Sequence, residues 1–437
     1  MLAPFDSGDG AAARPPYVSP SSGRRLGLAI VGFGGAVATT AVAGLDLLAR
    51  GLAGPQGLPL AGLEPALANA LVPYGGFVFG GWDLCGDDLA TAARAHGVLE
   101  PAQLEAASET LGALRPWPAV RNRAFLGGVD GAHVLNVPGL RAAVDAVRAD
   151  LRRFRAEQRL DGLVVMNLAS TEASPHAADE VFASAAAFEA AVDADDARIP
   201  PAMLYAYAAL LEGAPYGNFT PSTGADVPAL VEIARREGVP VAGKDGKTGQ
   251  TFLKTLLAPG LKARALEVEG WFSTNILGNR DGEALREGGS LASKLGTKAS
   301  VLDQILGYEV GSHVVSIHYY KPRGDAKEAW DNVDLVGFLG QRMQLKVNFL
   351  CRDSILAAPL AVEIARCLDL AHRAGQSGVC EALGVFFKSP QTADGRVPEH
   401  GFGAQQAHLE RWLAETAALT SVAEAASQAE VAPRADA

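Results

Sequence analysis

The chain has 437 residues, of which 49% are hydrophobic and 20% are charged, a composition typical of a globular protein with two or three domains. Its 38 lysine and arginine residues against 49 aspartate and glutamate residues give a net charge of −11, which argues against a nucleic-acid-binding protein. The four cysteines lie far apart without a CxxC pair. A disulfide scaffold and a zinc module are therefore excluded, and we expect the reduced thiols of a cytoplasmic protein.

The N-terminal region combines a polar lead with an uncharged stretch. Residues 1–22 are rich in Pro, Gly, Ala and Ser, and we expect them to be disordered. Leu26–Leu45 follows two arginines without any charge of its own, as in a twin-arginine signal peptide or a membrane span. Three glycines interrupt it, however, and it lacks the leucine and phenylalanine density of a span. We therefore predict a strand over Leu26–Val31, a glycine turn and a helix to about Arg50, with no membrane partner.

The glycine turn, Gly32-Phe33-Gly34-Gly35, lies between the predicted strand and helix. Glycines here allow a tight turn and let backbone N–H groups approach a pyrophosphate at the helix N-terminus. Ala38 stands where GxGxxG has its third glycine, and no acidic residue ends an obvious second strand about 20 residues on. The turn favours a dinucleotide site, with a plain packing turn as the alternative.

Strands and helices alternate in the first 250 residues. The apolar runs Leu163–Leu168 and Val239–Ala242 are typical of buried parallel strands. Helical patterns lie around Gly139–Glu157 and Ala202–Glu212. This alternation predicts an α/β fold with a doubly wound parallel sheet.

The pattern changes past residue 260. Ser312–Tyr320 and Met343–Leu350 alternate polar and apolar residues, which predicts an antiparallel sheet with one buried face in an α+β unit. Long helices return at Ile355–Arg373 and His408–Ala418, and the Ala/Glu-rich residues 421–437 are expected to be disordered.

All ten lysines lie between Lys244 and Lys388, whereas the 28 arginines are used throughout the chain. Lysine can lose its proton and arginine cannot, so this window is where we expect the chemistry. The alternative is a strand-rich domain of different composition.

Eight segments, taken in order over roughly residues 24–415, resemble the myo-inositol-1-phosphate synthase family. They are Gly80–Asp83, Asn218–Ser222, Gly243–Thr251, Thr274–Gly282, Ser293–Lys298, Gly324–Lys327, Cys351–Ser354 and Phe387–Pro390. The chain departs from the family where Ala36 and Val37 replace asparagines of the glycine turn, and where Lys244 replaces the first acid of a Gly-Asp-Asp segment.

The resemblance implies a Rossmann-type domain completed by C-terminal helices, with an inserted α+β domain that supplies the active site and tetramer contacts. The expected organisation is a disordered segment at 1–22, an NAD-binding Rossmann domain at 23–250, the inserted catalytic and oligomerisation domain at 251–353, C-terminal helices at 354–420 and a disordered tail at 421–437.

The family's reaction is an NAD-dependent isomerisation of D-glucose 6-phosphate to 1D-myo-inositol 3-phosphate, the first step of inositol and inositol-phospholipid biosynthesis. NAD⁺ takes a hydride from C5, the C6 proton is removed, C6 attacks the C1 aldehyde, and the hydride returns to C5. Such a site needs proton carriers, cations for a phosphate and donors for developing oxyanions. We expect mutual repulsion and burial to lower the pKa of the clustered lysines, with Lys388 desolvated by the apolar run Val385–Phe387.

By resemblance, Lys294 handles the C5 oxygen proton, Lys298 and Lys327 bind phosphate, and Lys388 serves the C1 oxygen. On spacing alone, Lys294 and Lys298 are an i,i+4 pair on a solvated helix face. The other expected catalytic and substrate residues are Asp353, Thr248, Gly249, Gln250, Asn275 and Leu277.

The cofactor-binding residues implied by the resemblance are Gly32, Phe33, Gly34, Gly35, Asp83, Ala169, Ser170, Thr171, Asn218, Asp245, Asp281 and Asp353. Asp83 has a second interpretation as a helix N-cap. The eight histidines form no HxH or HExxH pair, so a transition-metal site is not expected. A monovalent or divalent cation beside the nicotinamide is implied, with Asp281 as its ligand.

Two other functions are weighed against the synthase. One is a dehydrogenase of the same fold that acts on another sugar phosphate and accumulates NADH. The other is a non-catalytic NAD-binding regulator, which would have little need of the four lysines.

Overall fold

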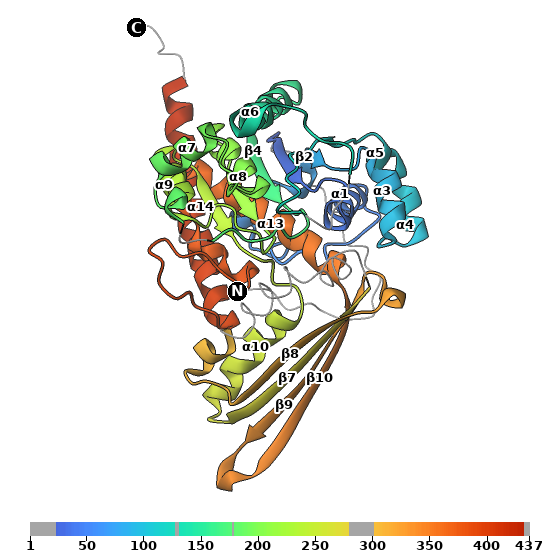
Figure 1. Cartoon of the computed structure of the whole chain (residues 1–437), viewed down its shortest axis with the longest axis vertical. Helices are drawn as coiled ribbons and strands as arrows, with labels where there is room; N and C mark the ends of the chain where they lie inside the picture. The colour runs from blue at the N-terminus through green and yellow to red at the C-terminus, as the bar shows by residue number, and fades with distance from the viewer. Residues whose placement is uncertain (1–22, 127–130, 177–178, 279–300, 432–437) are drawn as a thin grey trace.

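The computed structural model describes residues 23–126, 131–176, 179–278 and 301–431, which form two sheets with their helices (Figure 1). The larger sheet has seven parallel strands in the order β11-β6-β5-β4-β1-β2-β3. The strands are β1 Leu26–Val31, β2 Phe77–Asp83, β3 Trp117–Pro118, β4 Gly162–Asn167, β5 Tyr216–Asn218, β6 Pro240–Gly243 and β11 Gly378–Val379. The strand order turns back on either side of β1, as in a doubly wound sheet, which confirms the predicted fold class.

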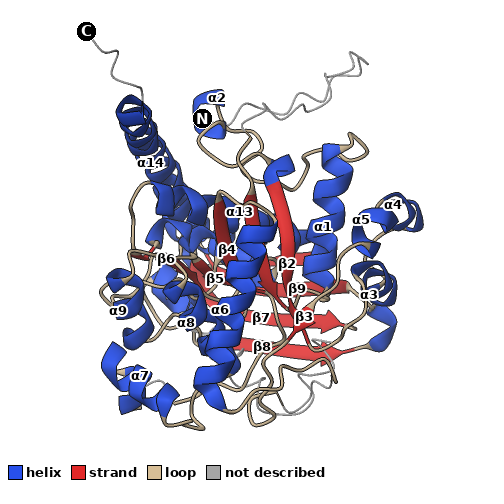
Figure 2. Cartoon of the chain, turned by 90° about the horizontal axis from the view of Figure 1, so that it is seen from above, coloured by secondary structure: helices blue, strands red, loops and turns tan. Residues whose placement is uncertain are grey.

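Helices cover both faces of this sheet (Figure 2). Leu28 and Ile30 of β1 face one core, and Ala29 between them faces the other, because successive side chains of a strand point to opposite faces. One core packs against α1, Ala36–Ala49, and α13, Asp353–Arg373, and the other against α6, Gly139–Glu157, and α8, Pro201–Leu211. The remaining helices around the sheet are α2 Pro65–Ala68, α3 Leu89–His96, α4 Pro101–Ala106, α5 Ser108–Gly112, α7 Ala185–Asp193, α9 Pro228–Arg236 and α14 Phe402–Val431.

The C-terminal helix α14 is longer than expected. It begins before His408 and continues to Val431, so the expectation of disorder from residue 421 is wrong over 421–431. The physical reason is that alanine and glutamate are good helix formers, so a segment poor in large apolar residues can still be helical. Within the described residues, no helix is both long and apolar enough to cross a membrane.

The second sheet has four strands in the order β10-β9-β7-β8 and projects from the α/β body (Figure 1). Its strands are β7 Glu267–Leu277, β8 Ser312–Tyr319, β9 Ala326–Val336 and β10 Arg342–Arg352. β9 is antiparallel to β7 and β10, but β7 and β8 run parallel, so the prediction of a purely antiparallel sheet is wrong. The chain between β7 and β8 is long enough for a crossover connection, which a parallel pair requires.

Side chains alternate between the two faces of this second sheet. Trp271 and Val333 point to the inner face, where α10, Gln250–Ala263, packs with Val301–Leu306. Phe272 and Val314 lie on the outer face and are 41% and 42% exposed. The expected one-face-buried pattern is therefore present in the described part of this sheet.

Candidate active site

The predicted cofactor residues gather at the carboxyl edge of the seven-stranded sheet. The glycine turn follows β1, Asp83 ends β2, Ala169–Thr171 follow β4, and Asn218 ends β5. Ligands of open parallel sheets bind at this edge, where the strand order reverses. Here the reversal lies between β1 and β4.

The conformation of the turn requires glycine. Gly32 has φ +85°, and a Cβ atom on it would lie 2.8 Å from Ala169 Cα. A Cβ on Gly34 would lie 3.2 Å from the Asp83 carboxylate. The backbone thus approaches its neighbours closely, and α1 begins directly after Gly35. These features fit a dinucleotide pyrophosphate at the helix N-terminus.

Asp83 corrects the expectation that the second strand lacks an acidic end. It is the last residue of β2, and its Oδ2 accepts a hydrogen bond from Gly34 N at 2.9 Å. The acid lies 49 positions after Gly34 because residues 50–76 intervene before β2 begins. The helix-cap interpretation belongs instead to Asp88, which caps α3. An acid in this position suits the ribose hydroxyls of NAD.

The other predicted cofactor residues differ in what they offer. Phe33 is fully buried in the core, so only its backbone faces the turn. Ser170 and Thr171 are both half-buried after β4. Asn218 is 2% exposed, and its amide braces the following loop by donating to the Ser222 carbonyl at 2.7 Å. Ala36 and Val37, which replace the family's asparagines, add no polar side-chain atom here.

The loop after β6 brings a lysine and an aspartate that are distant in sequence together. Asp245 Oδ1 accepts a hydrogen bond from Lys388 Nζ at 2.7 Å, and both side chains are largely buried. Backbone hydrogen bonds hold this loop on two sides. Asp245 N donates to the Thr220 carbonyl at 3.0 Å, and Lys388 N donates to the Asp245 carbonyl at 2.7 Å.

A second ion pair lies at the start of α13. Asp353 Oδ1 accepts from Thr248 Oγ1 at 3.0 Å and from Lys327 Nζ at 3.3 Å. Thr248 belongs to the loop before α10, and Lys327 to β9 of the second sheet. The two sheets therefore contribute side chains to one cluster, which we call the lysine–aspartate cluster: Asp245, Lys327, Asp353 and Lys388, with Thr248.

The charges of the lysine–aspartate cluster compensate one another. Burial raises the pKa of Asp353, but the ammonium groups of Lys327 and Lys388 outweigh it, so this pKa is below its ordinary value. For Lys327, burial favours a lower pKa and the Asp353 carboxylate favours a higher one. The net effect is that the pKa of Lys327 is above its ordinary value. The expectation that repulsion would lower the pKa of the lysines is therefore wrong for Lys327.

Lys388 also differs from its expected environment. Phe386 and Phe387 turn into the core, whereas the Lys388 ammonium reaches Asp245 instead of apolar side chains. An apolar run in sequence does not make an apolar environment when the residue after it leaves the core.

The expected substrate residues Gln250 and Asn275 lie on the inner face of the second sheet and are 3% and 1% exposed. Asn275 Nδ2 donates to Gln250 Oε1, and Gln250 Nε2 donates to both carboxylate oxygens of Asp331 at 3.3 Å. Gly249 precedes α10 directly, and Leu277 ends β7 with 5% exposure. Asp331 was missed by the sequence analysis.

Three expected residues, Lys294, Lys298 and Asp281, lie outside the described residues. Lys244, which replaces the family's acid, forms an ion pair with Asp226 at 2.6 Å. Lys247 from the same loop points away from the lysine–aspartate cluster. Its ammonium donates to Gln405 Oε1 at 2.6 Å, and burial lowers its pKa to about 7.

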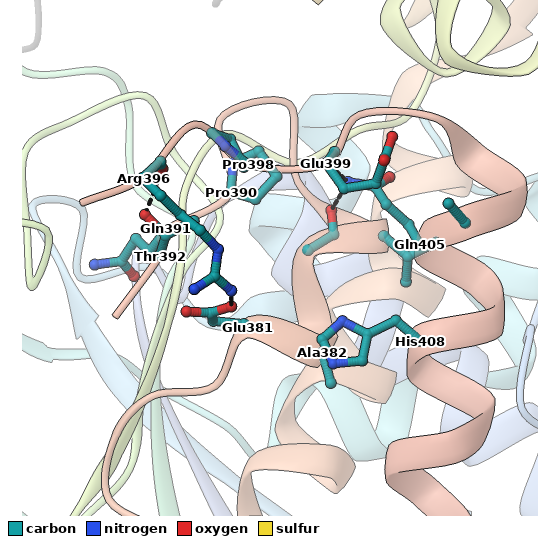
Figure 3. A pocket seen from close by; sticks show the side chains of 13 residues that line it. Glu381, Ala382, Pro390, Gln391, Thr392, Arg396, Pro398, Glu399, Gln405 and His408 are labelled. Carbon is teal, nitrogen blue, oxygen red and sulfur yellow. Dashed lines mark hydrogen bonds and ion pairs between the residues drawn. The ribbon is translucent and has the colours of Figure 1, made fainter. Parts of the chain in front are cut away.

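A separate cavity of about 120 Å³ lies beside Gln405, between α14 and the segment before it (Figure 3). Arg396 reaches Glu381 across one side of it, and His408 lines the other. None of the predicted site residues lines this cavity. The lysine–aspartate cluster is therefore the candidate active site.

Comparison with protein families matches residues 67–414 to the family described as myo-inositol-1-phosphate synthase. The chain is 41% identical to inositol-3-phosphate synthase 1 of Bacteroides thetaiotaomicron over 405 residues, covering 89% of this chain and 94% of the relative. It is 29% identical to the inositol-3-phosphate synthase of Saccharomyces cerevisiae, covering 79% of this chain and 72% of the relative. The crystal structure of the Caenorhabditis elegans inositol-3-phosphate synthase superposes with a TM-score of 0.83 at 26% identity, covering 90% and 86% of the two chains.

Proposed function

The chain belongs to the myo-inositol-1-phosphate synthase family, and on that premise we propose that it converts D-glucose 6-phosphate to 1D-myo-inositol 3-phosphate with NAD as its cofactor. The observation that carries the proposal is the lysine–aspartate cluster at the same sheet edge as the glycine turn. Cluster residues come from both sheets, as expected for a site between a cofactor domain and a catalytic domain.

NAD would be held by the glycine turn, Asp83 and Ala169–Thr171, with Asn218, Asp245 and Asp353 on the nicotinamide side. When bound, it supplies a hydride acceptor for one sugar carbon and later a hydride donor to the same carbon. The chain's own side chains must then bind the sugar, hold its phosphate and move protons.

Lys327 suits the phosphate because its ammonium stays charged beside Asp353. A charged donor forms shorter and stronger hydrogen bonds with phosphate oxygens than a neutral one. Thr248, Gly249 and Gln250 lie at the start of α10, where backbone N–H groups add to anion binding. Lys298 is assigned to the same phosphate by family resemblance.

Lys388 is placed to donate a proton to the C1 oxygen as the ring closes. Asp245 fixes the direction of its ammonium and is fixed in turn by backbone hydrogen bonds on two sides. A proton donor works only within hydrogen-bond reach of its acceptor, so this fixed geometry matters for the aldol step. Lys294 is assigned the C5 oxygen proton, and Asp353 orients Lys327.

One assay tests the reaction. Purified protein with catalytic NAD⁺ should convert glucose 6-phosphate to inositol phosphate without net NADH, because the hydride returns to the same carbon. Stoichiometric NADH in solution would identify a dehydrogenase instead. NAD binding without any turnover would identify a regulator.

We further propose a cytoplasmic homotetramer assembled through the second sheet. Phe272, Val314 and Leu350 on the outer face are 41%, 42% and 58% exposed, which leaves apolar area of this face open to a partner. A second copy of the same face would cover them.

The proposal includes a cation beside the nicotinamide, held by cofactor phosphate and Asp281. Among the described residues no group of three or more His, Cys, Asp or Glu side chains forms a metal site, and Asp281 lies outside those residues. Activity after exhaustive chelation, and its recovery with single monovalent or divalent ions, tests this part.

A further inference from the structure

Asp331 lies in the middle of the second sheet and is 1% exposed. Its neighbours are hydrogen-bond donors. Trp271 Nε1 donates to Oδ1 at 2.7 Å, Ser273 Oγ donates to Oδ1 at 2.6 Å, and Gln250 Nε2 donates to both oxygens. Trp271 and Ser273 come from β7, whose Ser273 pairs directly with Asp331 across the sheet.

A buried cation lies on the same side of the sheet. Lys254 of α10 is 1% exposed, with its Nζ 5.7 Å from the centre of the Trp271 ring and 2.7 Å from His313 Nε2. Burial lowers the pKa of Lys254 to about 8, and the Asp331 carboxylate opposes that shift. The Asp331 carboxylate therefore lies among hydrogen-bond donors and beside a positive charge.

An ionised carboxylate can only accept hydrogen bonds. The Gln250 amide must therefore turn its NH₂ group toward Asp331 and its oxygen the other way. That oxygen faces Asn275, so Asn275 must turn its own NH₂ group toward Gln250. The direction of two neutral amides is thus set by one charge.

The series of hydrogen bonds from Asp331 through Gln250 ends at Asn275 Oδ1. This atom is buried and has no hydrogen-bond partner among the described residues. Buried acceptors in folded proteins are nearly always paired, so an orphan beside an active site points to a donor brought by a ligand. A sugar hydroxyl is such a donor.

We propose that Asp331 is a positioning residue that, through Gln250, fixes the Asn275 amide so that the site presents an acceptor to a hydroxyl of the sugar phosphate. This inference rests on the proposed function, because it assumes a sugar phosphate in the site. It assigns Asp331 a role in specificity rather than in bond making.

The hydrogen-bond chain predicts what Asp331→Asn would do. The oxygen of the new amide would stay with Trp271 and Ser273, and the NH₂ group of that amide would face Gln250. Gln250 would then turn over, Asn275 would follow, and the site would present a donor in place of an acceptor.

The experiment compares glucose 6-phosphate with its 2-, 3- and 4-deoxy and deoxyfluoro analogues, using enzyme loaded with NAD. Both kcat/KM and the dissociation constant from calorimetry are measured, so binding is tested even where turnover is slow. Fluorine accepts weakly and cannot donate. For the wild type we expect one position at which the fluoro analogue is at least tenfold worse than the hydroxyl compound.

For each position we compare the hydroxyl compound with its fluoro analogue as a ratio of kcat/KM and as a ratio of dissociation constants. In Asp331→Asn the ratio at the discriminating position should fall toward one, while the ratios at the other positions stay unchanged. Gln250→Leu should lower the same ratio while leaving Asp331 its donors from β7, and it serves if Asp331→Asn folds poorly. Asp331→Glu, which keeps the charge, should retain much of the ratio. The matched control is Asp334→Asn on the same strand, whose carboxylate binds Asn332 and Gln344 on the other face and whose change should leave every ratio as in the wild type.

Two outcomes overturn the inference: a wild type that discriminates at no hydroxyl, or an unchanged ratio in both Asp331→Asn and Gln250→Leu. Failure of the proposed function gives a different result. The wild type would then bind glucose 6-phosphate without forming inositol phosphate, and the hydroxyl ratios in binding would still decide the role of Asp331.

Discussion

Lys388 and Asp245 are joined twice, although 143 positions separate them in the sequence. The backbone N–H of Lys388 donates to the Asp245 carbonyl at 2.7 Å, and its ammonium donates to the Asp245 carboxylate at 2.7 Å. The first bond fixes where the lysine stands, and the second fixes where its ammonium points. Two contacts between the same residues leave little freedom to a group that we propose donates a proton to one sugar oxygen.

Asp245→Asn should therefore damage the enzyme through Lys388. The change leaves a largely buried ammonium without its counter-charge, and breaking such an ion pair costs about 3 kcal/mol of stability. We expect kcat to fall at least tenfold with a smaller change in KM, and the thermal midpoint to fall. Asp226→Asn is the control, since it breaks the ion pair to Lys244 in the same loop but touches no proposed catalytic residue. Equal kcat losses in both variants would contradict the positioning role.

Lys327→Ala tests the phosphate assignment. A charge-assisted hydrogen bond contributes roughly 1.5–3 kcal/mol, so the affinity for glucose 6-phosphate should fall about tenfold or more. NAD⁺ affinity should change little. The pKa of Asp353 should rise, because the Lys327 ammonium is the charge that lowers it most. Calorimetric titration with each ligand gives both affinities, and unchanged substrate affinity would refute the assignment. Lys298→Ala should behave in the same way.

Much of the fold could be predicted from the sequence because its signals are local. The range Gly139–Glu157 coincides with α6, and Leu26–Val31 with β1, since period-3.6 and buried apolar patterns depend only on neighbours. The direction of β8 could not be predicted in this way because a strand's alternation is the same in parallel and antiparallel pairs.

The candidate active site could not be predicted from local sequence patterns. Nothing near Lys388 in the sequence points to Asp245, and family resemblance alone placed both in one site. A search for an acidic residue about 20 positions after the glycine turn does not find Asp83, because residues 50–76 lie between α1 and its strand. Asp331 lies four positions after Lys327 in β9, so both side chains share a face, but the sequence could not say that α10 buries that face.

The tetramer is tested on the outer face of the second sheet. The wild type should have a tetramer mass by light scattering at micromolar concentration, and a monomer mass would refute the proposal. Val314→Lys should reduce the mass because it places a charge on the face that a second copy would cover. Leu52→Lys, a change at an apolar residue of 58% exposure in the α/β body, should leave the mass unchanged.

Glu172 should make stability fall as pH rises. It is 6% exposed, accepts from Ala202 N at the start of α8, and burial raises its pKa to about 8. Between its unfolded value near 4.5 and about 8, the native state holds a proton that the unfolded state has lost. This stabilisation is complete below the pKa of Glu172 in the unfolded chain. It is lost as the pH rises to the pKa in the folded protein, and the free energy of unfolding falls by about 1.4 kcal/mol per pH unit on the way. Glu172→Gln, which does not titrate, should become more stable relative to the wild type from pH 5 to pH 9 in denaturant unfolding. Parallel stability curves would show that Glu172 is ionised in the native protein.

Lys388→Ala separates ring closure from the first hydride transfer. If the Lys388 ammonium donates to the C1 oxygen during the aldol step, its loss should stop the reaction after C5 is oxidised, because C6 can then no longer be captured. Enzyme-bound NADH should build up on mixing with glucose 6-phosphate and be visible in the nicotinamide absorbance, to no more than one equivalent per site. Lys294→Ala, which removes the group assigned to the C5 oxygen, should show no such build-up because that group acts before the hydride moves.

The alternative role for Lys388 is a structural one, in which its aliphatic part packs on the edge of the core and its ammonium pairs with Asp245. That role predicts a less stable enzyme with near-normal turnover and no trapped NADH. Trapped NADH in Lys388→Ala alone is therefore the result that assigns Lys388 to ring closure.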